Sequence, residues 1–203
     1  MSKIFPWRAV LRKNSPQGLT LLESFFAVAI LGAVIAILFL SFSAGELSQA
    51  ASSVKLELQA QARRLSDWIG NDARQAVSWE IADAGNSPDS AHIKFRQVVG
   101  WDTVANNYLL STNYVEYAYD SGQGSVTRKI LDPGGGVIQS WNFDYVVQPP
   151  FYTRDPANNP VALNSSDLLT SRRLITTIVL QKTIRGGLST GFSMSNEVKI
   201  RNE

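Results

Sequence analysis

The chain has 203 residues, of which 44% are hydrophobic, and its 19 basic and 17 acidic residues give a net charge of +2. This length allows one folded domain in addition to a terminal anchor. The absence of cysteine excludes disulfides, thiol nucleophiles and cysteine metal ligands, and a single histidine, His92, leaves little material for acid–base catalysis. We therefore expect no enzyme. Because the basic pairs are scattered along the sequence, we expect no specific nucleic-acid partner.

The first 18 residues form a basic leader that precedes a long apolar run. The leader contains four basic residues and no acid, so removing it would leave the remaining chain with a net charge of −2. The apolar run from Leu19 to Phe42 is long enough, at ~1.5 Å per helical residue, to cross a hydrocarbon layer of about 30 Å. Its only charged residue is Glu23. Since a lone carboxylate in a membrane span is costly, Glu23 is a candidate functional residue.

The order of these segments differs from that of a secretory signal, in which the small-residue cleavage site follows the apolar core. Here the small residue, Gly18, precedes the apolar run. Cleavage after Gly18 would remove the leader and retain the membrane helix. The new α-amino group of Leu19 would then lie four residues before Glu23, on the same helix face. The alternative interpretation is an uncleaved single-span anchor.

The stretch Gly18-Leu19-Thr20-Leu21-Leu22-Glu23 resembles the processing motif of type IV pilins and type II secretion pseudopilins. The resemblance implies that a prepilin peptidase/N-methyltransferase cuts between Gly18 and Leu19 and methylates Leu19. It also implies that Glu23 is the assembly glutamate, which pairs with the amino terminus of a neighbouring subunit. The alternatives for Glu23 are a pairing within its own chain or simple protonation.

Two departures from the family pattern refine this resemblance. The first residue after the cut is usually Phe and is Leu19 here, and major pilins usually have a helix-breaking proline at the position of Leu40. The missing proline favours a minor subunit. The run Asp72-Ala73-Arg74-Gln75-Ala76 and the ending 193–202 resemble J-type pseudopilins and related minor pilins, whereas Glu23 argues against a K-type tip subunit.

The resemblance implies a minor pseudopilin of a type II secretion system, at or near the tip of the periplasmic pseudopilus, that helps to initiate assembly for protein export. The alternative is a minor pilin of a type IV pilus, which would serve assembly priming, adhesion or DNA uptake. Expected partners are the prepilin peptidase, other minor and major pseudopilins or pilins, and inner-membrane lipid. The expected location is the inner membrane as a single-pass protein with a periplasmic C-terminal domain, and then the filament.

The fold class that we expect is α+β: a long N-terminal helix packed on an antiparallel β-sheet domain, in a pilin-like layout. The continuous apolar run predicts that residues 19–44 form the membrane half of this helix. Apolar residues at three- and four-residue steps predict that residues 45–80 form its amphipathic half. Residues 81–203 then form the β-rich globular part, and its first three or four strands are expected to make an antiparallel meander. The expected strands are 92–99, 114–119, 125–131, 137–147, 174–183 and 191–200.

Residues 148–171 contain four prolines and an Asn158-Asn159 pair, and they predict a long loop that is either a subunit contact or a mobile insertion. No resident cofactor is expected. A calcium site is the less favoured alternative to ordinary turn chemistry, because oxygen ligands gather in two loops. The candidate ligands are Asp83, Asn86 and Asp89 in one loop, and Asp155, Asn158 and Asn159 in the other, with Asp167 further on.

Overall fold

The computed structural model describes residues 20–83, 88–184 and 187–201. The chain forms two units, residues 1–47 and 48–203, and the long helix α1 (Leu21–Arg74) begins in the first and ends in the second. The predicted cleavage and methylation sites, Gly18 and Leu19, lie outside the described residues.

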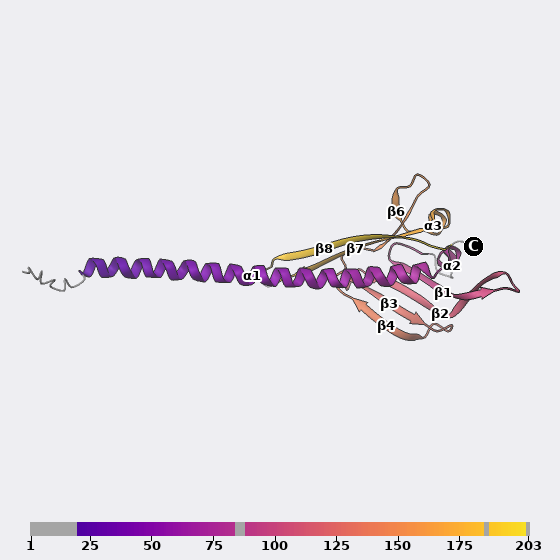
Figure 1. The fold of residues 1–203 in the computed structure, drawn as a ribbon, viewed down its shortest axis with the longest axis horizontal. Helices are drawn as coiled ribbons and strands as arrows, with labels where there is room; N and C mark the ends of the chain where they lie inside the picture. Colours follow the sequence, from indigo (N-terminus) through magenta and orange to yellow (C-terminus); the bar gives the residue numbers. More distant parts are fainter. Residues whose placement is uncertain (1–19, 84–87, 185–186, 202–203) are drawn as a thin grey trace, which may run out of the picture. The chain divides into compact units, whose positions relative to one another are not determined.

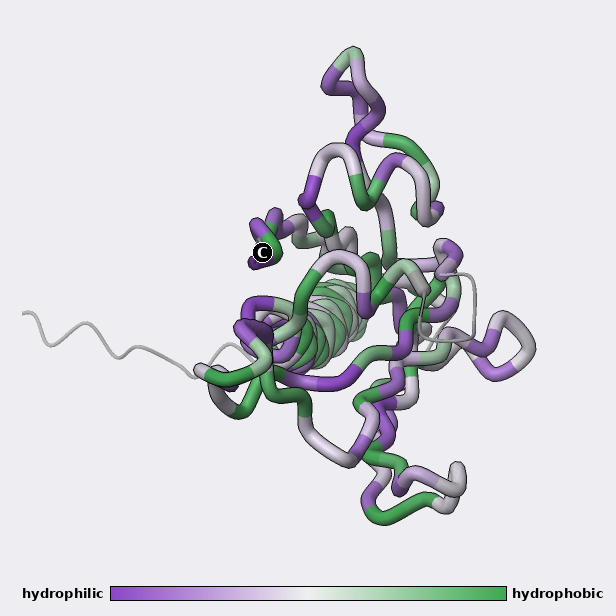
Figure 2. Tube along the Cα trace, turned by 90° about the vertical axis from the view of Figure 1, so that its right-hand side faces the viewer, coloured by the Kyte–Doolittle hydropathy of each residue, from purple (hydrophilic) through white to green (hydrophobic). Residues whose placement is uncertain are grey.

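The first unit consists, in its described part, of the N-terminal turns of α1. Among the described residues, this is the one helix that is long and apolar enough to span a membrane, and none of its apolar window is buried in the structure. Large side chains from Leu21 to Phe42 are exposed on all sides of the helix. The turns of α1 visible in Figure 2 are predominantly hydrophobic. A helix that is apolar all round is typical of a membrane span.

In the second unit α1 becomes amphipathic. Its fully buried apolar residues fall at three- and four-residue steps: Leu58, Ala62, Leu65, Ile69 and Ala73. This spacing places them on one face of the helix, as the sequence pattern predicts.

The helix ends at Arg74, earlier than the expected boundary near residue 80. The Gln75 amide hydrogen-bonds to the Asp72 carbonyl, three residues back, and so tightens the last turn. The Gln75 carbonyl then accepts a hydrogen bond of 2.7 Å from Val98, and Val77 pairs with Arg201. These contacts with the β-structure end α1, and a short second helix, α2 (Ser78–Asp83), follows.

The first sheet is an antiparallel meander in the order β1-β2-β3-β4, which confirms the prediction. Its strands are β1 (His92–Asp102), β2 (Asn107–Asp120), β3 (Ser125–Leu131) and β4 (Val137–Phe143). Strand β4 ends four residues before the predicted position, because the chain there crosses to the other sheet. Val146 donates to the Gly124 carbonyl next to β3, and Val147 donates to Val179 in the second sheet.

The second sheet has the order β6-β5-β7-β8. It consists of β5 (Phe151–Arg154), β6 (Pro160–Ala162), β7 (Arg173–Thr183) and β8 (Ser189–Lys199), with the helix α3 (Ser165–Ser171) between β6 and β7.

Segment 148–171, expected to be a loop, therefore contains two strands and a helix. Phe151 and Leu168 are fully buried, so this segment contributes to the core. Pro160 begins β6 at the sheet edge, where a missing amide donor is tolerated. Asn164 caps α3 by accepting a hydrogen bond from the Asp167 amide.

The C-terminal part of α1 lies between the two sheets, with β7 and β8 on one side and β1 to β4 on the other (Figure 1). Trp68 of α1 contacts Trp141 of β4, and Ser66 accepts a hydrogen bond from Asn196 of β8. One buried cluster joins residues from α1 and from both sheets. The second unit therefore has its own core, and the long helix with an antiparallel β-domain confirms the α+β class.

Candidate functional site

Glu23 lies in the first turn of α1, where it forms a reciprocal cap with Thr20. Its Oε2 accepts hydrogen bonds from the Thr20 amide, at 2.8 Å, and from the Thr20 hydroxyl, at 2.9 Å. The Glu23 amide in turn donates to the Thr20 hydroxyl, at 3.3 Å. This arrangement is the capping box that a Thr-x-x-Glu sequence favours at a helix start. This cap was not predicted, although the Thr-x-x-Glu spacing is visible in the sequence.

The capping box leaves part of the Glu23 carboxylate available. Within the described residues, Oε1 of Glu23 has no hydrogen-bond or ion-pair partner. Because Leu19 lies outside the described residues, the expected pairing of its amino group with Glu23 remains a prediction. The geometry offers two roles for this carboxylate: a local cap through one oxygen, and a contact with another group through the other.

A buried polar cluster holds the end of α1 against the first sheet. The Asp72 carboxylate accepts hydrogen bonds from the Tyr117 hydroxyl, from Nε of Arg128 at 2.8 Å and from the Gln97 amide at 3.0 Å. Burial and the neighbouring Asp72 carboxylate raise the pKa of Tyr117 well above its usual value. Burial acts to lower the pKa of Arg128, but the hydrogen bonds and charge interactions with Asp72 and Tyr117 together outweigh this effect and raise the pKa.

The Arg128 guanidinium also lies against two indole rings, 5.2 Å from the centre of Trp68 and 4.9 Å from that of Trp141. In the sequence, Asp72 was noted only as part of the subgroup motif. In the structure it stabilises the fold, because it neutralises the charge of Arg128, which is surrounded by aromatic side chains. Its partners Tyr117 and Arg128 are at least 45 residues away in the sequence, and no local pattern marks them.

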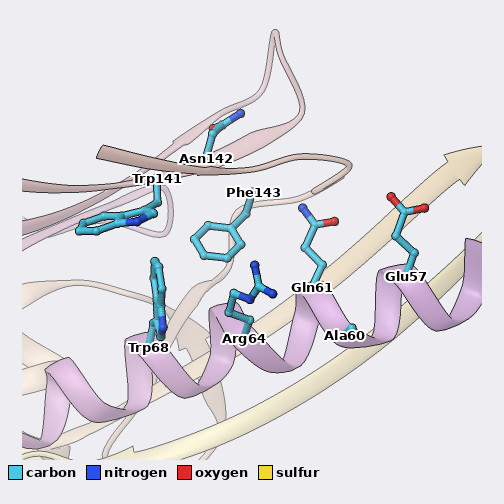
Figure 3. A pocket seen from close by; sticks show the side chains of 8 residues that line it. All are labelled: Glu57, Ala60, Gln61, Arg64, Trp68, Trp141, Asn142 and Phe143. Atoms are coloured by element: carbon cyan, nitrogen blue, oxygen red, sulfur yellow. The ribbon is translucent and has the colours of Figure 1, made fainter. Parts of the chain in front are cut away.

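Beside this cluster, a cavity of about 350 Å³ opens between α1 and β4 (Figure 3). The wall from β4 consists of Trp141, Asn142 and Phe143, and the wall from α1 includes Arg64 and Trp68. Glu57, Ala60 and Gln61 complete the lining. The cavity therefore combines aromatic surface with one cationic side chain, which suits an apolar and acidic partner group.

A second cavity, of about 600 Å³, lies beside the β1–β2 hairpin. Trp79 of α2 and Trp101 of β1 line it, and the Trp101 ring stands edge-on to Tyr108 at 5.1 Å. Arg96 also lines this cavity, but its guanidinium makes two hydrogen bonds to Glu80, which raise the pKa of Arg96.

The proposed calcium ligands take part in local turn and cap contacts in the part of the chain that the structure describes. Asp89 accepts hydrogen bonds from the amides of Ala91 and His92, and Asp155 accepts from the Asn159 amide at 2.7 Å. Asp167 pairs with Asn164 at the start of α3. The Asp83 side chain and Asn86 lie outside the described residues. No group of three or more histidines, cysteines or carboxylates suited to a metal ion occurs among residues 20–83, 88–184 and 187–201.

Comparisons with protein-family models, with curated proteins and with solved structures found no match to this chain.

Proposed function

We propose that this protein is a minor pseudopilin of a type II secretion system, anchored in the inner membrane and incorporated near the tip of a periplasmic pseudopilus. The observation that carries the proposal is the first turn of α1. There Glu23 is the only charge in an apolar helical segment that runs to Phe42, and it is the last residue of the motif that resembles a prepilin processing site.

The layout of α1 and of the β-domain supports this proposal. An exposed apolar helix continues into an amphipathic segment that packs on an antiparallel β-domain, which is a pilin-like arrangement. Such a chain carries a membrane anchor and a soluble domain on one helix. Head-to-tail contacts that do not close generate helical filaments, so the anchor can also act as the polymerisation element.

The electrostatics of a membrane segment give Glu23 its role in assembly. An ammonium and a carboxylate are each costly in hydrocarbon, and pairing them removes much of that cost. The amino terminus of Leu19 in one subunit and Oε1 of Glu23 in the next would form such a pair. The helix cap can persist in this state, because it uses Oε2.

Two substitutions at one position separate the cap from the charge. Glu23→Gln keeps an oxygen that can accept the Thr20 hydrogen bonds but removes the charge, and glutamine is an accepted capping-box residue. Glu23→Leu removes both. We expect both full-length variants to be processed and membrane-inserted, and both to be lost from sheared filament preparations.

Normal filament recovery with Glu23→Leu would refute the assembly role. If Glu23→Gln is incorporated normally and Glu23→Leu is not, the carboxylate acts as a helix cap rather than as an ion-pair partner. Export of the secreted cargo, measured in the same strains, distinguishes a pseudopilin from a pilus subunit.

A further inference from the structure

Strand β4 forms one edge of the first sheet and has neither a charged residue nor a proline among its seven residues, Val137–Phe143. Its pairing with β3 has one irregularity, between Ile130 and Leu131, which skips Ile138. Val137 and Ile138 are 57% and 51% exposed. An exposed edge presents unpaired amide and carbonyl groups that can template another strand, and natural proteins usually block it with charge, proline or a bulge.

Each of the other three sheet edges carries a charge or a proline. Strand β1 has Lys94 and Arg96. Strand β6 has only three residues and begins with Pro160. Strand β8 ends with Glu197 and Lys199, and its Asn196 hydrogen-bonds to Ser66 of α1. Among the edge strands of the two sheets, β4 is therefore the one with neither a charged residue nor a proline.

The cavity between α1 and β4 adds a charge preference to this edge. Among the described residues, the Arg64 guanidinium has no hydrogen-bond or ion-pair partner. The only acid in the lining, Glu57, is already paired with Lys182 at 3.0 Å. In Figure 3 the Arg64 side chain extends from α1 toward Phe143, below the β4 residues. The site is therefore cationic and aromatic, and a carboxylate is the group that complements it.

We propose that β4 binds an extended segment of another polypeptide as a fifth strand, with an acidic side chain of that segment paired with Arg64. The backbone of β4 supplies hydrogen bonds, and the indole and phenyl rings of Trp68, Trp141 and Phe143 receive an apolar side chain. A second copy of β4 fits less well, because β4 has no acid to offer Arg64.

This inference rests on the proposed function in one respect: the identity of the partner, which would be another membrane-anchored subunit. The edge and the cavity are properties of the second unit and do not depend on Glu23. A neighbour bound at β4 would be selected by charge as well as by shape, which provides a means to order different subunits in one assembly.

Site-specific photo-crosslinking in cells tests the proposal with the full-length chain. A photoreactive phenylalanine derivative replaces Ile138 in β4, and in a matched control it replaces Val99 in β1, which is also exposed. We expect an adduct at position 138 that is absent at position 99. Mass spectrometry of the adduct should place an Asp or Glu within about four residues of the cross-linked site, the reach of neighbouring strand positions.

Charge reversal at Arg64 completes the test. Arg64→Glu should lower the yield of the adduct at least about fivefold, because two like charges would then face each other. Arg63→Glu is the matched control, since Arg63 is the preceding exposed arginine but does not line the cavity, and it should leave the yield unchanged.

Three results would overturn the proposal: no adduct at 138 above the level at 99, an adduct that Arg64→Glu does not weaken, or an adduct formed only with a second copy of this chain. Parallel measurement with Glu23→Leu keeps the two proposals separate. Normal filament incorporation of that variant refutes the assembly role, whereas the adduct at 138 reports on β4 alone.

Discussion

Replacing Asp72 with asparagine tests the account of the buried polar cluster. The substitution preserves the size of the side chain but removes the charge opposite Arg128. The two side chains are only 10% and 12% exposed, so water cannot readily compensate for the loss. Removing one member of a buried ion pair typically costs about 3–5 kcal/mol.

The expected effect is near the lower end of that range. Asparagine retains an oxygen that can accept one hydrogen bond, and Arg128 keeps its contacts with the rings of Trp68 and Trp141. A loss of about 3 kcal/mol corresponds to a decrease of about 6–12 °C in the unfolding temperature of a domain of this size. The assay is thermal unfolding of the full-length chain in mild detergent, followed by tryptophan fluorescence.

Asp67→Asn is the matched control, because Asp67 lies on the same helix but is exposed and has no partner among the described residues. It should change the free energy of unfolding by no more than about 0.5 kcal/mol. The double variant Asp72→Asn, Arg128→Met should recover part of the lost stability, since it removes the uncompensated cation. Equal unfolding temperatures for Asp72→Asn and Asp67→Asn would refute the reasoning.

Three further measurements test other parts of the fold. Gly124→Ala should lower the free energy of unfolding by about 1–3 kcal/mol, because Gly124 has a φ of +61° and the added Cβ would lie 3.3 Å from the Val146 carbonyl. The control Gly122→Ala should cost less, because Gly122 has no positive φ. Two flanking arginines lower the pKa of Glu197, so the stability that its charge contributes should be lost as pH falls below the ordinary pKa of 4.5. The pKa of Tyr117 is raised, so stability should decrease as pH rises above the ordinary pKa of 10.0. An unfolding temperature that stays constant from pH 3 to 11 would contradict both predictions. Leu168→Ala should lower the free energy of unfolding, measured in urea, by about 2–5 kcal/mol, because Leu168 is fully buried. An unchanged free energy would indicate that segment 148–171 is a mobile loop.

The sequence was most informative where the physical rule is local. The hydrophobic period of three and four residues predicted the buried face of α1 from Leu58 to Ala73, because helix geometry repeats over a few residues. The strand Ser125–Leu131 matched its predicted bounds, since turn residues delimit it on both sides. The same local reasoning would also have found the capping box of Thr20 and Glu23.

The remaining features depend on contacts between distant residues. Helix α1 ends at Arg74 because the Val98 amide binds the Gln75 carbonyl. No local sequence pattern predicts this hydrogen bond. The prolines of segment 148–171 suggested a loop, but the burial of Phe151 and Leu168 outweighs that preference. The cavity between α1 and β4 likewise arises from residues 73 to 86 positions apart, which only the three-dimensional structure brings together.

The position of α1 between the two sheets has a consequence for the order of folding. Ser66 contacts Asn196 across 130 residues of sequence, and Glu57 contacts Lys182 across 125. The apolar face of the helix therefore cannot be fully covered until the last strand has been synthesised. Because such distant pairings form slowly, the nascent chain must keep this face protected for most of its synthesis, and a chain that stops before β8 should be handled as an unfolded protein.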